Sequence, residues 1–220
     1  MSLDEIAAPE RTIASTRPPR PTNVPRTVFH VGSGAVALFF LRVLPSREWL
    51  MVASALFAAS AWTCEISRRM SPRINERLMR LFGPVAHPHE WREVNSATWY
   101  ATALFIMSLV VPLPAAELGV LVLAVADPTA GFVGRRFGRY RLASGRSIEG
   151  ALGFAISGTL AAFAWLTITG SEPHAARLVL ALVAGFIGAA IELLVSKVDD
   201  NLAIPLFTSL AVAAAALVVH

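Results

Sequence analysis

Long apolar runs separated by short polar connections dominate the chain. They cover approximately residues 28–44, 49–64, 97–111, 118–133, 151–170, 178–195 and 202–219. An upright transmembrane helix needs about 20 apolar residues. Several runs are slightly shorter, and the arginines beside them can extend their charged groups to the membrane interface. The pattern predicts an all-α integral membrane protein, a polytopic bundle of about seven transmembrane helices.

A different pattern fills the longest polar connection, between the second and third runs. Its apolar residues recur every four positions, at Ile66, Met70, Ile74, Leu78 and Phe82. Arginines and Glu76 occupy the other faces, and Gly83 and Pro84 would end the helix. This predicts a short amphipathic helix on the cytoplasmic surface. It is either an anchor on anionic lipid or a lid over a site.

The first 27 residues are rich in Pro, Arg and Thr and contain no apolar run. They resemble neither a signal peptide nor a globular domain. We expect residues 1–27 to be a disordered cytoplasmic arm and residues 28–220 to form a single polytopic membrane domain that carries any catalytic site.

Composition and charge support this topology. The chain has 220 residues, of which 55% are hydrophobic and 15% charged, with a formal net charge of +4. If the seven runs alternate in direction, most of the 19 basic residues fall on one side, leaving only Arg42, Arg47 and Arg177 on the other. Cytoplasmic loops collect Lys and Arg. The N-terminus is therefore predicted inside and the C-terminus outside, and the basic balance gives no indication of nucleic-acid binding.

Most acidic residues near the runs lie on the same predicted cytoplasmic side. They are Glu65, Glu90, Glu93, Asp127, Glu149, Glu192, Asp199 and Asp200. Charged groups within a bilayer are costly and commonly functional. These acids are either interfacial caps or, together with neighbouring arginines, a site that holds a polyanion through metal ions and guanidinium groups.

The densest polar segment is residues 127–150, DPTAGFVGRRFGRYRLASGRSIEG. Pro128 is expected to break the helix at Asp127, which would then cap a new half-helix or bind a metal. Three glycines spaced by three and four residues share a helical face that suits either helix packing or close approach of a nucleotide; they are Gly131, Gly134 and Gly138. Ser147 and Glu149 begin the next run, where they can cap the helix or help bind a phosphate.

Several motifs in order resemble one family. They are RTVFHVGSG at 26–34, Glu65, EWREVNSATW at 90–99, ADPTAGFVGRRFG at 126–138, GRSIEG at 145–150, Glu192 and DDNLAIPL at 199–206. Together they resemble the CTP-dependent lipid kinases, namely dolichol kinase, phytol kinase and the CTP-using diacylglycerol kinase, from about residue 26 to the C-terminus. Ala126, Arg146 and Ala203 depart from the residues that are common in the family.

The resemblance implies transfer of the CTP γ-phosphoryl group to the hydroxyl of a membrane lipid alcohol, giving a lipid monophosphate and CDP. The implied ligands of Mg²⁺ are Asp127, Asp200 and Glu149, because hard cations take carboxylate oxygens. The implied nucleotide and phosphate contacts are Gly131, Gly134, Arg135, Arg136, Gly138, Arg139, Arg146, Ser147 and Asn201. The general base stays open among Asp127, Glu149 and Asp199. His30 is either a weaker candidate base or a structural residue, and Glu65, Glu93 and Glu192 are further candidates for the site.

Other functions remain open on the sequence alone. A CTP:phosphatidate cytidylyltransferase shares a similar Asp, Gly-rich and Ser-x-Glu-Gly region, although its longer C-terminal signature is missing here. A small transporter or scaffold is the non-enzymatic alternative. The sequence contains neither a GxxxxGK[ST] phosphate loop nor a protein-kinase signature. The identity of the lipid alcohol is open, and Gly-rich and Ala-rich runs would permit a homodimer.

Overall fold

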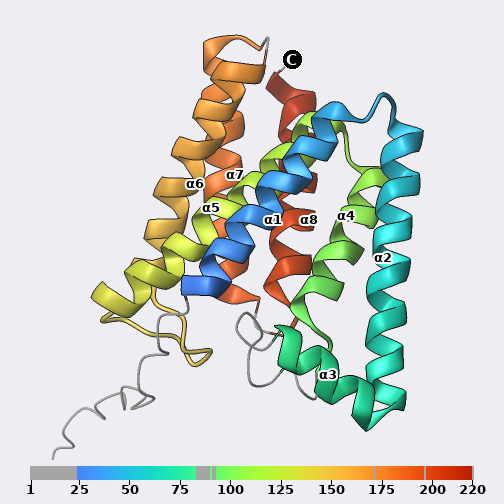
Figure 1. Cartoon of the computed structure of the whole chain (residues 1–220). Helices are drawn as coiled ribbons and strands as arrows, with labels where there is room; N and C mark the ends of the chain where they lie inside the picture. Colours follow the sequence, from blue (N-terminus) through green and yellow to red (C-terminus); the bar gives the residue numbers. More distant parts are fainter. Residues whose placement is uncertain (1–23, 83–89, 91–92, 171, 196, 220) are drawn as a thin grey trace, which may run out of the picture.

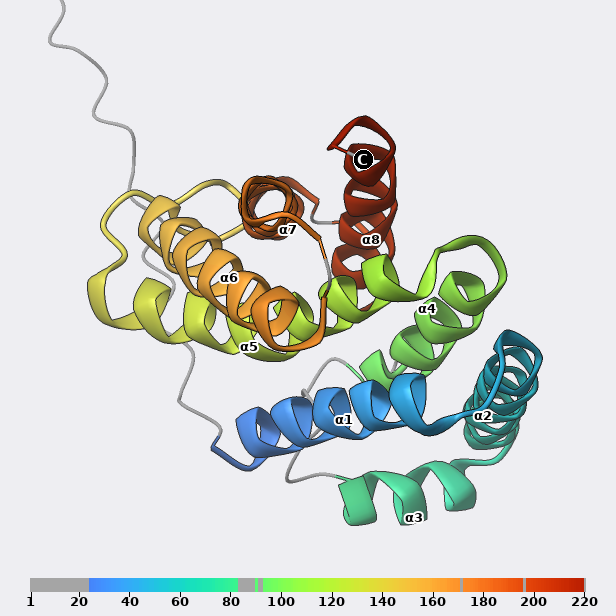
Figure 2. The ribbon, with the colours of Figure 1, turned by 90° about the horizontal axis from the view of Figure 1, so that it is seen from above.

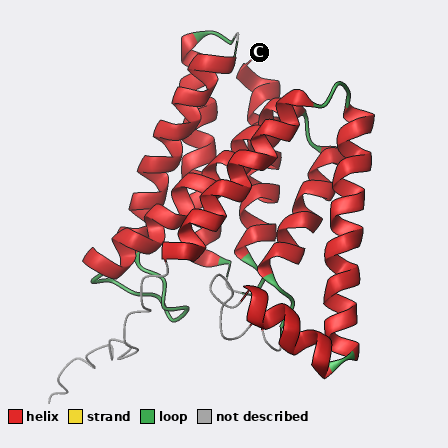
Figure 3. Ribbon diagram, viewed as in Figure 1, coloured by secondary structure: helices red, strands yellow, loops and turns green. Residues whose placement is uncertain are grey.

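The computed structural model describes residues 24–82, 90, 93–170, 172–195 and 197–219. These residues form helices and loops without a strand (Figure 3). The helices are α1 (Val24–Val43), α2 (Arg47–Met70), α3 (Pro72–Phe82), α4 (Ser96–Val110), α5 (Leu113–Phe137), α6 (Ile148–Thr169), α7 (His174–Leu194) and α8 (Asp200–Val219).

Six of these helices, α1, α2, α5, α6, α7 and α8, are long and apolar enough to cross a membrane. The remaining apolar helix, α4, has only 15 residues. The prediction of a polytopic helical membrane protein is confirmed, with a short helix where the third run was expected to span. Together with α4, the long helices alternate in direction along the chain, and α3 lies across one end of the bundle while the C-terminus lies at the other (Figure 1). We call the first of these the α3 end.

The core forms around α5, which contacts α1, α6, α7 and α8 (Figure 2). Its residues 118–124 are all buried, with Val120 and Val122 fully inaccessible. Gly119 allows the closest contact with α8, because a Cβ there would come within 2.4 Å of the carbonyl oxygen of Pro205. Small residues let membrane helices pack closely in this way.

The end of the bundle opposite α3 holds a buried carboxylate. Glu117 accepts hydrogen bonds from Arg42 at 2.6 Å and from the indole of Trp165 at 2.8 Å. The Arg42 guanidinium also lies over the Trp165 ring, 5.5 Å from its centroid. These contacts tie α1 to α5 and α6, and the arginine offsets the charge of the acid.

The predicted helix break at Pro128 is wrong, because α5 continues through this proline to Phe137. Asp127 therefore lies inside a helix and caps nothing. Proline is tolerated within membrane helices when neighbouring elements support the disturbed backbone. Here the Thr129 hydroxyl donates to the carbonyl of Val125 at 2.7 Å, and His30 of α1 lies 3.0 Å from the carbonyl of Leu123. Packing on several sides keeps the helix continuous.

The predicted amphipathic helix is divided. Ile66 and Met70 belong to α2, whereas the other three apolar positions belong to α3. Ser71 has an extended backbone between the two helices, and Pro72 begins α3, a position where its missing amide costs nothing. Met79 is buried against the bundle. The helix ends at Phe82, as predicted, while residues 83 and 84 lie outside the described residues.

The start of the first span is also corrected. Residues 24–27, which we assigned to the N-terminal arm, form the first turn of α1. Residues 1–23 of that predicted arm lie outside the described residues.

Candidate active site

A charged cluster at the α3 end is organised by Arg146, in the loop before α6. Its Nη2 atom lies 2.6 and 2.7 Å from the two carboxylate oxygens of Asp200 on α8. Its Nη1 atom donates to the carbonyl of Val195 at 2.8 Å, and its Nε atom is 3.9 Å from Glu192 of α7. One guanidinium thus joins the loop before α6 to the end of α7 and the start of α8, a role suited to its planar array of donors.

Asp127 of α5 adds a third carboxylate. It lies within electrostatic range of both Glu192 and Asp200. Its carboxylate is also 3.8 Å from Nε2 of His30 on α1. The structure therefore brings together Asp127, Arg146, Glu192 and Asp200, which were all named as candidates from the sequence. We call these four residues the charge cluster.

The donor set of the charge cluster suits a metal ion that is shared with phosphates. Among the described residues, no group of three or more His, Cys, Asp or Glu side chains could hold a metal by itself. Mg²⁺, however, is commonly bound by one or two carboxylates and completed by phosphates and water. Within the described structure, Glu192 Oε2 is buried without a hydrogen-bond partner. A carboxyl oxygen without a partner thus lies beside the Asp127 and Asp200 carboxylates.

Glu149 and Ser147 stabilise the loop and helix start in this structure. The Glu149 carboxylate accepts hydrogen bonds from the backbone amides of Arg139 at 3.0 Å and Tyr140 at 3.2 Å. The Ser147 hydroxyl accepts the amide of Gly150 at 3.0 Å and caps α6. Glu149 therefore binds backbone donors here.

Two glycines of the polar segment let the end of α5 approach the start of α6 closely. A Cβ at either Gly134 or Gly138 would come within 2.8 Å of the Ser147 hydroxyl. A Cβ added at Gly131 would lie 3.1 Å from the Nη1 atom of the Arg135 guanidinium. The Nε atom of Arg135 is buried and unpaired within the described structure, while Arg136 is exposed.

Asp199 and Asn201 form the start of α8. One carboxylate oxygen of Asp199 accepts hydrogen bonds from both the backbone and the side-chain nitrogen of Asn201, each at 2.9 Å. The other oxygen accepts the Ser96 hydroxyl at 3.2 Å. Asp199 is therefore occupied by hydrogen bonds that order the helix start, next to Asp200 of the charge cluster.

Glu65 and Glu90 form a second buried acidic group, which ties α2 to the segment before α4. Glu65 accepts two hydrogen bonds from Arg68, both at 2.8 Å, and one from Arg69 at 2.6 Å. Glu90 accepts the Asn95 amide at 2.9 Å and the Ser96 hydroxyl at 2.8 Å. Buried charges need such compensation. Glu93 is exposed, and its backbone carbonyl accepts a hydrogen bond from Arg68.

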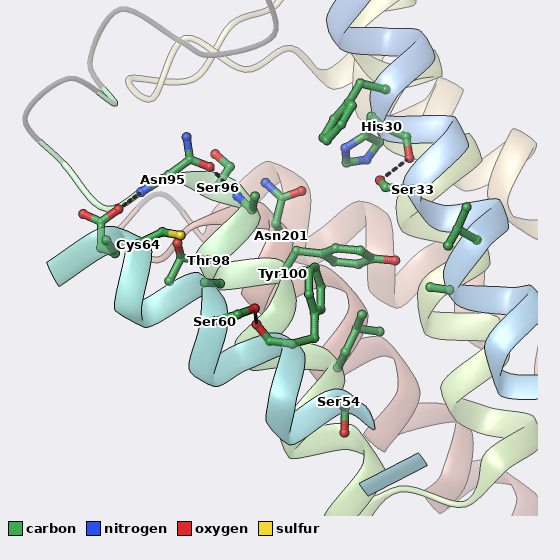
Figure 4. Close-up of a pocket in the computed structure, with 18 of the residues that line it drawn as sticks. His30, Ser33, Ser54, Ser60, Cys64, Asn95, Ser96, Thr98, Tyr100 and Asn201 are labelled. Carbon is green, nitrogen blue, oxygen red and sulfur yellow. Dashed lines mark hydrogen bonds between the residues drawn. The ribbon is translucent and has the colours of Figure 1, made fainter. Parts of the chain in front are cut away.

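A cavity of about 940 Å³ lies between α1, α2 and α4 and reaches α3 (Figure 4). Most of its lining is apolar, but its polar residues include His30, Asn95, Ser96 and Asn201. Val36, Phe40 and Phe57 line the cavity and are also about half exposed at the surface. The cavity therefore opens sideways between α1 and α2, towards the surface that lipid would cover. The sequence did not indicate it, because its walls use the same apolar residues as any transmembrane span.

Comparison with known proteins identifies a relative over most of the chain. The protein is 29% identical over 196 residues to CTP-dependent diacylglycerol kinase 1 of Schizosaccharomyces pombe (strain 972 / ATCC 24843), covering 84% of this chain and 90% of the relative. This similarity supports the CTP-dependent lipid kinase family. No family model and no solved structure matches it.

Two residues connect the cavity with the charge cluster. His30 lines the cavity and lies 3.8 Å from Asp127. Asn201 lines the same cavity and directly follows Asp200 in α8. An apolar space and a dense charged site thus meet at the α3 end.

Proposed function

We propose that the protein transfers the γ-phosphoryl group of CTP to the hydroxyl of a lipid alcohol held in the cavity, giving a lipid monophosphate and CDP. The observation that carries this proposal is the junction of the lateral cavity with the charge cluster at His30 and Asn201. A lipid acceptor needs an apolar space that reaches the bilayer. A triphosphate needs cationic groups and carboxylates that can share a metal ion.

The charge cluster would hold the triphosphate end of the nucleotide. Arg146 and the partly buried Arg135 are the cations best placed to bind phosphate oxygens, with Arg136 and Arg139 exposed at the same end. Asp127 and Asp200 would hold Mg²⁺, which supplies neutralisation of phosphate charge when it is bound. Phosphoryl transfer depends mainly on positioning and electrostatic stabilisation. Glu149 has a supporting role in this proposal, through the amides of the preceding loop.

The cavity would hold the hydrocarbon part of the acceptor, with its hydroxyl at the polar end near His30. The S. pombe relative is a diacylglycerol kinase by name, so a diacylglycerol is the first acceptor to test. We further propose that the α3 end faces the cytoplasm, because most arginines gather there and cytoplasmic loops are rich in basic residues.

Asp127→Asn tests the proposal in the full chain, purified in detergent micelles with Mg²⁺ and lipid alcohols. With γ-labelled CTP, the unaltered protein should label a lipid monophosphate. Asp127→Asn should lower the rate at least 100-fold, because a neutral amide is a poor ligand for a hard cation. Glu48→Gln is the matched control, since Glu48 is exposed at the opposite end of the bundle.

Two results would contradict the kinase proposal. The first is conversion of phosphatidate into a CDP-lipid with release of pyrophosphate, which would identify a cytidylyltransferase. The second is absence of turnover with every acceptor in a folded preparation.

A further inference from the structure

Tyr100 carries a buried hydroxyl that the structure leaves unsatisfied. The residue lies on α4, and only 8% of it is exposed. Its hydroxyl has no hydrogen-bond partner among the described residues. Buried polar atoms in folded proteins nearly always have a partner, because desolvating an unpaired hydroxyl is unfavourable. The Tyr100 hydroxyl therefore indicates a binding partner that the protein itself does not supply.

The surroundings of Tyr100 define where that partner would lie. A recess of about 10 Å³ is lined by His30, Ser33, Tyr100 and Asn201 together with a stretch of α5. Those four residues also line the large cavity. In Figure 4 the Tyr100 ring extends from α4 towards α1. The recess has about the size of one water-sized sphere, which is room for a single oxygen atom beside the lipid space.

The other polar groups of the recess already have partners. The Ser33 hydroxyl donates to the carbonyl of His30 at 2.9 Å. The His30 ring lies 3.0 Å from the carbonyl of Leu123, and the Asn201 side chain donates to Asp199 at 2.9 Å. Of the two hydroxyls that line the recess, on Ser33 and Tyr100, only that of Tyr100 has no hydrogen-bond partner among the described residues.

We infer that the Tyr100 hydroxyl donates a hydrogen bond to an ester carbonyl of the acceptor and makes the site selective for glycerolipid alcohols over isoprenoid alcohols. This inference rests on the proposed function. We place the phosphorylated hydroxyl on the Asp127 side of His30, at the charge cluster, and a second oxygen of the same lipid in the recess at Tyr100. A diacylglycerol has ester carbonyls to supply it, whereas an isoprenoid alcohol has only the reacting hydroxyl. A lipid without carbonyls would leave the buried Tyr100 hydroxyl unpaired, and a site discriminates strongly against a substrate that leaves its polar groups unpaired.

Tyr100→Phe tests the inference with two acceptors that differ only in the carbonyls. These are a 1,2-diacylglycerol and the 1,2-dialkylglycerol of the same chain length, each presented in mixed micelles with γ-labelled CTP. The unaltered protein should favour the diacyl lipid about tenfold in kcat/KM, the effect of one neutral hydrogen bond. Tyr100→Phe should abolish this preference by slowing only the diacyl lipid. An isoprenoid alcohol should be a poor acceptor for both proteins.

The matched control is Tyr140→Phe, which removes the hydroxyl of the other tyrosine, 71% exposed beyond α5. This variant should retain the preference for the diacyl lipid. Thermal unfolding provides a second readout. Because the Tyr100 hydroxyl has no protein partner, Tyr100→Phe should unfold at the same temperature as the unaltered protein or slightly higher.

The inference is overturned if the unaltered protein phosphorylates both glycerolipids equally, if it prefers the isoprenoid alcohol, or if Tyr100→Phe slows both lipids to the same extent. A marked fall in the unfolding temperature also overturns it, since the hydroxyl would then hold a structural water. These outcomes leave the kinase proposal intact. If CTP phosphorylates none of the three acceptors, the proposed function fails and this inference fails with it.

Discussion

Arg146 concentrates the electrostatics of the site in one side chain. It opposes carboxylates from two different helices, and its fork also binds the carbonyl of Val195. Both Arg146 and Asp200 were named from the sequence, but their direct pairing depends on how the loop before α6 approaches α8. The sequence indicated the residue types of the charge cluster, whereas only the fold shows which of them meet.

Substitution of Arg146 should separate the effects of charge and geometry. Arg146→Ala leaves the neighbouring carboxylates unopposed and should lower kcat/KM for CTP at least 100-fold. Arg146→Lys keeps a positive charge but loses the planar fork, so we expect a loss of about tenfold. Steady-state kinetics with varied CTP measures both values. Arg80→Ala, exposed on α3, is the control; equal losses in the Lys and Ala variants would contradict the importance of charge.

At the scale of the helices, hydrophobic length predicted the spans well. The exceptions have local physical causes. Pro128 does not interrupt α5, because surrounding helices support the backbone that proline disturbs. The apolar positions from Ile66 to Phe82 share one spacing but belong to two helices, since Ser71 adopts an extended backbone before Pro72. Tertiary packing and single backbone angles decide such cases, and spacing alone does not report them.

Gly119→Ala tests the packing of α5 on α8. The added methyl would lie 2.4 Å from the Pro205 carbonyl oxygen, a backbone atom that can move only with its helix. Overpacking of this kind should cost about 1–3 kcal/mol of unfolding free energy. Thermal unfolding in detergent gives the change. Gly32→Ala is the matched control, because nothing lies within 4 Å of its added methyl; equal stability of the two variants would show that α5 and α8 adjust freely.

The cavity exists only at the scale of the whole molecule. It arises because α1 packs mainly on α5 and α2 mainly on α4, which leaves space between the two pairs. No single segment of sequence contains this feature. The sequence therefore predicted a charged site beside spans, and it could not predict the shape of the space next to that site.

Filling the cavity should separate acceptor binding from nucleotide binding. Ala61 of α2 lines the cavity, so Ala61→Phe should raise the KM for the lipid alcohol at least tenfold by occupying its space. The KM for CTP should stay unchanged, because the charge cluster is contributed by α5, α7, α8 and the loop before α6. Ala59→Phe places the same ring at an exposed position of α2 outside the lining. A similar KM increase in both variants would contradict the assignment of the cavity to the acceptor.

The sideways opening between α1 and α2 changes which concentration controls the reaction. A lipid that enters through this opening never leaves its leaflet, and its phosphorylated product can return by the same route with its tail still among the neighbouring lipids. The rate should therefore follow the mole fraction of the alcohol in the membrane. Adding inert lipid should slow turnover even when the amount of alcohol per volume of sample stays constant. The protein would thus respond to the composition of the membrane in which it lies.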